Sequence, residues 1–115
     1  MSDRMMPTNH GRDFMQALTG KQKRHLKSLA QSMPPLAIIG KGGLSQAALD
    51  NVRRLLDGRE LLKVRLPALP PADRRSATAA LAESVGATCV DTIGRMVLLY
   101  RPCESLDPSE RISLP

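Results

Sequence analysis

Three segments of the chain repeat apolar residues at the spacing of an α-helix. From Leu18 to Gln31, apolar positions follow the i, i+3, i+4, i+7 pattern, and lysines and arginines without any acid occupy the opposite side. A second segment, Ser45 to Asp57, and a third, about Ala72 to Val85, have the same spacing. The pattern predicts three helices, the first of which is apolar on one side and basic on the other.

Each predicted helix has recognisable ends. Thr19 and Gln22 have the spacing of a capping box, in which each side chain accepts a backbone N–H of the first turn. Ser45 can cap the second helix, and Gly58 fits the left-handed position after its last turn. The third helix is predicted to end at Gly86. Its inward face is expected to hold Ala77, Ala80, Leu81 and Val85.

Four short segments have the patterns of β-strands. Residues 36–39, "LAII", are fully apolar, whereas "ELLKVRL" alternates, so that Leu62, Val64 and Leu66 share one face of a half-exposed strand. The segments "TCVDTI" and "MVLLYR" are separated by Gly94-Arg95, a two-residue link suited to a type II′ hairpin. We expect Arg95 to project from its tip.

The element order is therefore α-β-α-β-α-β-β. Strands joined through a helix run parallel by a right-handed crossover, and the final hairpin is antiparallel. This predicts an α/β (α+β) domain with a four-stranded mixed sheet packed by helices, with the strand order left open. Residues 1–17 are expected to be a disordered leader, and residues 18–115 a single domain with an irregular C-terminal tail.

Charge is distributed unevenly along the chain. The net charge is +6, and Met1 to Leu66 holds 12 Lys and Arg against 5 Asp and Glu, whereas Pro67 to Pro115 holds 5 against 6. This segregation favours an anionic surface such as nucleic acid over charge kept only for solubility. Aromatic residues make up only 2% of the chain, so stacking on aromatic rings is excluded as the main way of holding a ligand.

The glycine-rich stretch "GKGG" lies between the first predicted strand and the second predicted helix. A phosphate-binding P-loop is excluded because Lys41 is followed by Gly42, and a dinucleotide fingerprint is incomplete because Ser45 takes the place of its third glycine. Two interpretations stay open. Gly40 to Gly43 can be a GxxG loop, where missing Cβ atoms let a phosphodiester approach the main chain, or simply a tight turn.

Other chemistry finds little support in the sequence. Cys89 and Cys103 have no CxxC spacing and there are only two histidines, so we expect no metal site and reduced thiols in a cytoplasmic protein. There is no nucleophile elbow, HxE motif or carboxylate pair on one face, which argues against an enzyme, a cofactor or a small-molecule substrate. No apolar run approaches the ~20 residues that span a bilayer.

Five stretches in order resemble one known family. They are "LTGKQKRHLKSLA", "IIGKGGLS", "ELLKVRL", "GATCVDTIGRMVLLYRP" and "RISLP", covering about Leu18 to Pro115. They are similar to the CRM domain (chloroplast RNA splicing and ribosome maturation) in its free-standing bacterial form, the YhbY-like RNA-binding proteins. The resemblance implies a domain similar to the C-terminal half of bacterial translation initiation factor three. Gly42 departs from the family pattern, because relatives often carry a polar side chain such as Asn there.

The resemblance also implies a function, namely non-enzymatic binding of structured ribosomal RNA, on precursors of the large ribosomal subunit. The sequence does not disclose the oligomeric state, and we expect a monomer when the protein is free. The alternative is an adaptor that docks an acidic, ribosome-associated protein on the same basic face. The expected RNA contacts are the loop residues Gly40, Lys41, Gly42 and Gly43 and the first-helix residues Lys21, Lys23, Arg24 and Lys27. Lys63, Arg95 and Arg101 are expected as secondary contacts.

Overall fold

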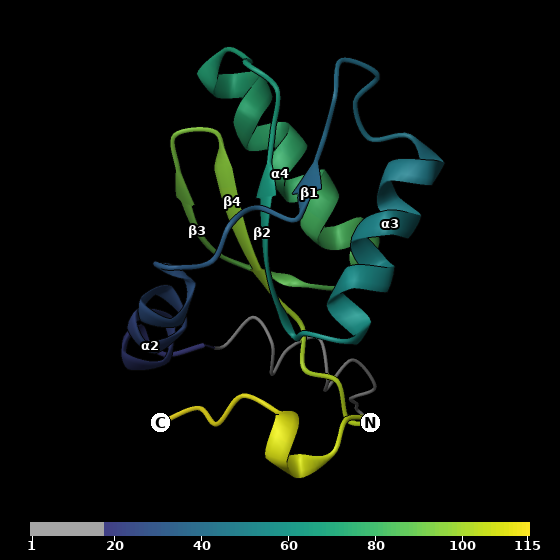
Figure 1. Cartoon of the computed structure of the whole chain (residues 1–115). Coiled ribbons are helices and arrows are strands. Elements are labelled where there is room, and N and C mark those ends of the chain that lie inside the picture. The colour runs from purple at the N-terminus through teal and green to yellow at the C-terminus, as the bar shows by residue number, and fades with distance from the viewer. Residues whose placement is uncertain (1–17) are drawn as a thin grey trace, which may run out of the picture.

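The computed structural model describes residues 18–115, so the predicted leader at residues 1–17 lies outside the described residues. The elements follow the predicted order (Figure 1). They are α2 (Gly20–Ala30), β1 (Ala37–Ile38), α3 (Gln46–Asp57), β2 (Leu61–Arg65), α4 (Pro71–Val85), β3 (Thr88–Ile93), β4 (Met96–Tyr100) and a short 3-10 helix, η1 (Pro108–Glu110).

The four strands form one mixed sheet in the order β1-β2-β4-β3. β1 pairs parallel with β2, and β4 pairs antiparallel with both β2 and β3. Because β4 runs against both of its neighbours, β1, β2 and β3 share one direction. This confirms the parallel crossovers and the antiparallel hairpin that the sequence predicts. The hairpin inserts its second strand, β4, into the middle of the sheet.

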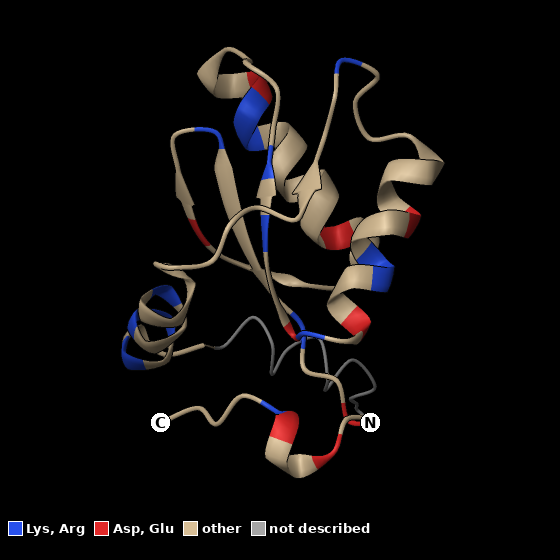
Figure 2. Cartoon of the chain, in the orientation of Figure 1, with Lys and Arg blue, Asp and Glu red and all other residues tan. Residues whose placement is uncertain are grey.

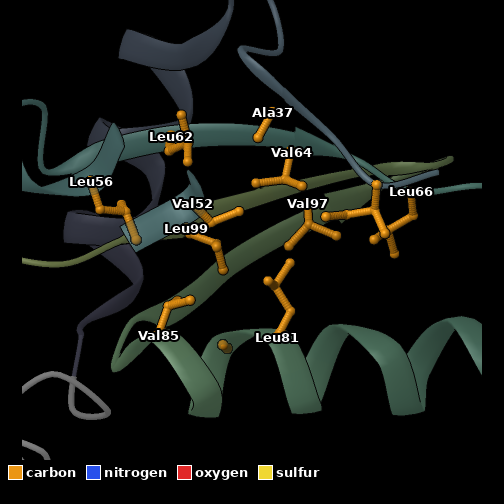
Figure 3. Packing of buried hydrophobic residues seen from close by; sticks show 12 residues of the cluster. Ala37, Val52, Leu56, Leu62, Val64, Leu66, Leu81, Val85, Val97 and Leu99 are labelled. Carbon is orange, nitrogen blue, oxygen red and sulfur yellow. The ribbon is translucent and has the colours of Figure 1, made fainter. Parts of the chain in front are cut away.

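One face of the sheet is closed by α3 and α4. The alternation of β2 is as predicted, since Leu62, Val64 and Leu66 are buried on this side. Figure 3 shows them packed with Val52 and Leu56 of α3 and with residues of α4 and β4. The buried stripe of α4 is Thr78, Leu81, Ala82 and Val85, at i, i+3, i+4 and i+7. Ala80 is exposed, so its predicted inward position is wrong.

The other face of the sheet is covered only in part. Leu26 and Ala30 of α2 pack on Leu61 and Tyr100, where β2 starts and β4 ends. Two residues of the tail, Ile112 and Leu114, pack against the same cluster. Leu61 is only 2% exposed, so β2 is buried on both faces at its start, and the prediction of a half-exposed strand holds only further along.

The predicted helix ends are mostly confirmed. Thr19 and Gln22 form the capping box, with 3.0 Å for each of its two hydrogen bonds, and the Ser45 side chain accepts the N–H of Ala48. Gly86 has a positive φ of 68°. Gly58 has a φ of −100°, so its predicted left-handed conformation is wrong. The positive φ occurs two residues later.

Glu60 has this left-handed conformation, with a φ of 65°, although it is not glycine. Its fully buried carboxylate accepts the backbone N–H of Cys103 at 2.5 Å, the N–H of Ile112 at 2.7 Å and Nε of Arg111 at 3.3 Å. These bonds hold the tail against the sheet and offset the left-handed backbone at Glu60. The tail is thus held in place, and its one regular element is the short helix Pro108–Glu110.

Candidate nucleic-acid interface

The face of the sheet on which α2 packs is open beyond the end of this helix. The strand register places Ile38, Arg65, Met96 and Ile93 side by side, one from each strand, and we call these four residues the open row. Ile38 and Ile93 are 67% and 70% exposed. Both residues end an edge strand, and apolar side chains this exposed in one row with a cation indicate a surface that contacts a partner.

A second row lies next to the open row, toward α2. It contains Lys63, Leu98 and Asp91, which are aligned on β2, β4 and β3. The register of β3 shifts between Cys89 and Asp91, so Val90 has no partner on β4. This bulge lets both Val90 and Asp91 face α2. Val90 joins the apolar cluster and Asp91 pairs with Lys27 of α2 at 3.5 Å.

Three loops meet at one end of the sheet. The N–H of Ile39, just before the glycine stretch, donates to the carbonyl of Arg65 at 2.8 Å, and the N–H of Leu66 donates to the carbonyl of Arg95 at 2.8 Å. The end of β2 therefore lies between the start of the β1–α3 loop and the β3–β4 hairpin. We call residues 39–43, 65–66 and 94–95 the loop end of the sheet, and its cations are Lys41, Arg65 and Arg95.

The glycines of the β1–α3 loop have different structural roles. Gly43 has a φ of 74°, so its backbone conformation explains why glycine is present. Gly40 and Gly42 have no such φ, and a Cβ added at either would meet nothing within 4 Å. A tight turn therefore requires Gly43 alone. The two other glycines leave the main chain bare toward solvent, as a phosphate needs for close approach.

The loop also carries backbone donors. The N–H of Gly43 bonds to the carbonyl of Gly40 at 3.0 Å, but the exposed amides of Lys41 and Gly42 have no acceptor within residues 18–115. Helix α3 begins at Gln46, and its cap, Ser45, is itself outside the GxxG stretch. The free backbone donors at the glycines therefore belong to the loop itself, before the start of the helix.

Helix α2 carries its four predicted cations on exposed positions, Lys21, Lys23, Arg24 and Lys27. It packs where β2 starts, whereas the GxxG loop follows the end of β1, which pairs with the end of β2. The loop and the basic helix are thus not neighbours, and the open row lies between them. Their separation is about the length of β2, roughly 15 Å at the rise of a strand, so one duplex turn of ~34 Å can contact both.

The cations differ in their partners. Within residues 18–115, the ion pairs are Lys27–Asp91, Arg53–Asp50, Arg101–Asp57 and Arg111–Glu60. In that part of the chain, Lys41, Lys63, Arg65 and Arg95 form no ion pair. Figure 2 shows basic segments on α2, along β2, at the hairpin tip and at the β1–α3 loop. Cations that have no ion-pair partner on an exposed surface attract an anion.

The structure separates Arg101 from this group. Its guanidinium donates to the carbonyls of Val85 at 2.9 Å and Arg53 at 3.2 Å and pairs with Asp57. Arg101 therefore ties the last turns of α3 and α4 to the end of β4, at the opposite end of the sheet from the GxxG loop. Its internal contacts explain its presence without RNA.

Sequence reasoning missed part of this surface. The alternation of "ELLKVRL" places Arg65 on the same face as Lys63, but only Lys63 was expected as a contact. The apolar residues of the open row, Ile38, Ile93 and Met96, could not be identified from the pattern, because the strand order and the extent of α2 decide what is uncovered. Among the described residues no group of acids, cysteines and histidines could hold a metal ion. No helix in that part could span a membrane.

The fold and this face define a small α+β domain with one closed sheet face and one partly open, cationic face. The chain belongs to the CRS1 / YhbY (CRM) domain family, whose model matches residues 18–101.

Named relatives agree with the family. The chain is 34% identical over 98 residues to "Probable RNA-binding protein YqeI" of Bacillus subtilis, covering 85% of this chain and 99% of the relative. It is 33% identical over 101 residues to an "RNA-binding protein" of Haemophilus influenzae, covering 88% and 98%. A solved structure from Staphylococcus aureus, titled as a candidate RNA-binding protein, superposes with a TM-score of 0.71 at 38% identity, covering 85% of this chain and 99% of that one.

Proposed function

We propose that this protein binds structured RNA, without catalysis, on the partly open face of its sheet. One observation supports this most strongly, namely that Gly40 and Gly42 are glycine although neither their φ nor the space around them requires the absence of a side chain. They lie at the same end of the sheet as Lys41, Arg65 and Arg95, which have no ion-pair partner within residues 18–115. The relatives named as RNA-binding proteins support the choice of RNA among polyanions.

The proposed contacts differ in kind. Lys41, Arg65 and Arg95 neutralise phosphates at the loop end, and the amides of Lys41 and Gly42 donate to phosphate oxygens. The cations of α2 contact the same RNA at a second place. Phosphate contacts supply affinity that falls with salt but little sequence choice, so recognition depends mainly on the shape of the folded RNA.

The finer part of the proposal follows from the family resemblance. We propose that the RNA belongs to a precursor of the large ribosomal subunit and that binding takes place in the cytoplasm during subunit assembly. Sedimentation of a cell extract tests this proposal. The protein should sediment with precursors of the large subunit, whereas sedimentation only as free protein would contradict the proposal.

Substitutions at Gly42 test the role of the loop. Gly42→Ala adds a methyl group and Gly42→Asp adds a carboxylate, and the added Cβ of either meets no atom of the protein within 4 Å. We expect Asp to weaken binding of a ribosomal RNA fragment at least tenfold, because a carboxylate would face phosphate, and Ala to weaken it less. Thermal unfolding should be nearly unchanged in both. Equal affinity of Gly42→Asp and the unsubstituted protein would remove the loop from the site.

The alternative, an adaptor for an acidic protein, has support from the exposed Ile38 and Ile93, since apolar residues among cations also occur in protein interfaces. Recovery of partners from an extract with and without ribonuclease separates the two proposals. An RNA-binding protein loses its ribosomal partners after the RNA is destroyed, whereas an adaptor retains them.

A further inference from the structure

A small hollow lies between the last turn of α2 and the sheet. Its walls are apolar and come from Ala30 of α2, Met96 and Leu98 of β4 and Ile93 of β3. It has a volume of about 80 Å³, well below the roughly 300–1,000 Å³ of pockets that enclose a whole small ligand. The hollow therefore has room for one group of a larger ligand, next to Met96 and Ile93 of the open row.

The rim of the hollow combines cations with one acid. Lys27 and Lys63 provide positive charge on either side, and Asp91 lies on the same rim. An acid on a face that binds phosphate repels the ligand and needs an explanation. Lys27 contacts only one carboxylate oxygen, Oδ2, at 3.5 Å, and Asp91 Oδ1 has no partner within residues 18–115. The Asp91 side chain is 31% exposed and so can be reached by a ligand.

We propose, resting on the proposed RNA-binding function, that this hollow receives one unpaired nucleobase of the bound RNA and that Asp91 accepts hydrogen bonds from the base. The apolar walls contact the faces of the base in place of aromatic rings. Lys27 and Lys63 contact the phosphates on its two sides. The acid is then required for base recognition, and the adjoining cations offset its repulsion of phosphate.

The chemistry of a carboxylate selects among bases. An ionised carboxylate only accepts hydrogen bonds, so it favours a base edge made of donors. Guanine presents a ring N–H and an exocyclic amino group next to each other, a pair that a carboxylate accepts together, as it does with arginine. Gln31, on the same rim, can donate or accept. Guanine is therefore the expected base, and inosine, which lacks the amino group, should bind less tightly.

The test uses one RNA hairpin whose stem carries a single bulged nucleotide, which is guanosine, inosine or an abasic residue. The three RNAs have the same phosphates, so the ratio of their affinities for one protein reports only the contacts of the base. We expect the guanosine hairpin to bind about tenfold more tightly than the inosine hairpin, the size of one hydrogen bond to a charged group. The abasic hairpin should bind most weakly.

Three variants separate the possible roles of the hollow. Asp91→Asn should reduce the guanosine-to-inosine ratio to below about twofold. Lys27→Gln is the matched control, because it breaks the same ion pair but keeps the carboxylate, and the ratio should persist at lower affinity. Ile93→Ala shortens a side chain that is 70% exposed, so folding should be unaffected, while the guanosine-to-abasic ratio falls.

Other results would overturn the inference. Equal binding of the three hairpins by the unsubstituted protein would show that no base enters the hollow, and would leave it to an apolar side chain of a protein partner. Equal loss of affinity for all three hairpins in Asp91→Asn would show that Asp91 only positions α2. Failure of every hairpin to bind would instead contradict the proposed RNA-binding function itself.

Discussion

The two ends of the sheet use their charged residues differently. At one end, which we call the tail end, the side chains of Glu60 and Arg101 bond to backbone groups of other segments, and Arg111 pairs with Glu60. At the loop end, Arg65 and Arg95 have no ion-pair partner within residues 18–115. Arg101 and Arg95 have the same side chain six residues apart, yet one stabilises the fold and the other is available to an external anion.

The difference shows that exposure and partners, rather than residue type, separate structural from functional charge. At the tail end, buried backbone amides and carbonyls need partners, and the charged side chains supply them. At the loop end, the carbonyls of Arg65 and Arg95 already accept backbone N–H groups, so their side chains have no structural task there. Four measurements can break or sharpen this comparison, and they follow in order of expected effect.

The largest effect is expected from removing the carboxylate at the tail end. Glu60→Ala leaves the amides of Cys103 and Ile112 and the Arg111 guanidinium without their acceptor. Hydrogen bonds to a charged group contribute about 1.5–3 kcal/mol each, so the free energy of unfolding should fall by at least about 3 kcal/mol in urea titrations. RNA affinity per folded molecule should hardly change. Lower RNA affinity without loss of stability would contradict the division of roles.

Removing two cations at the loop end should have the opposite result. Arg65→Ala with Arg95→Ala should weaken RNA binding about tenfold and flatten the slope of log K against log salt by about 1.5, with unchanged unfolding. The matched control is Arg54→Ala with Arg59→Ala, which removes the same charge from exposed positions that are not at the loop end. Equal losses in both double variants would mean that only net charge matters.

The basic helix should contribute less than the loop end. Lys23→Ala with Arg24→Ala should weaken RNA binding about threefold and flatten the salt slope by about 0.8, because we expect one of the two side chains to contact a phosphate at this second place. Neither residue has an ion pair within residues 18–115. Filter binding at several salt concentrations measures both quantities. A slope that stays the same would show that RNA does not contact α2.

The smallest effect concerns alkaline pH. Burial, and then the charge of Asp91, raises the pKa of the Cys89 thiol above 9.0, and burial, and then the charge of Glu60, raises the pKa of the Tyr100 hydroxyl above 10.0. The unfolded chain therefore releases these protons first. The contribution of these two groups to the free energy of unfolding should be complete at neutral pH and should be lost as pH rises through their raised pKa values.

Urea titrations at pH 8 and at about pH 10.5 measure this loss. In Cys89→Ser and Tyr100→Phe, less stability should be lost between the two pH values than in the unsubstituted protein, since each variant lacks one of the titrating groups. An identical loss in both variants and in the unsubstituted protein would assign it to other residues.

The sequence predicts the fold well because the fold depends on local patterns. Helical spacing, the Thr19–Gln22 capping box and the Gly94-Arg95 link each act within a few residues, and together they determine the element order and strand directions. Glu60 shows where such reasoning ends. Its role depends on Cys103 and Ile112, more than 40 residues away, which no local pattern indicates.

The site was predicted less completely, for the same physical reason. Glycines and a lysine in "GKGG" are a local signal, and the loop is exposed as a binding loop must be. The open row is not local, because Ile38, Arg65, Met96 and Ile93 come from four strands whose order cannot be derived from the alternation alone. Nor does the sequence show that α2 stops short of this row and leaves the loop and the helix apart.

The central claim is that RNA covers the loop end, the open row and the adjoining side of α2. An NMR titration of the 15N-labelled protein with a ribosomal RNA hairpin tests it most directly, because each amide reports separately. We predict that the signals of residues 40–43, 63–65 and 93–96 and of α2 shift together with one affinity, and that those of α4 stay in place. Shifts confined to α3 and α4, or to the tail end around Glu60, would contradict the account.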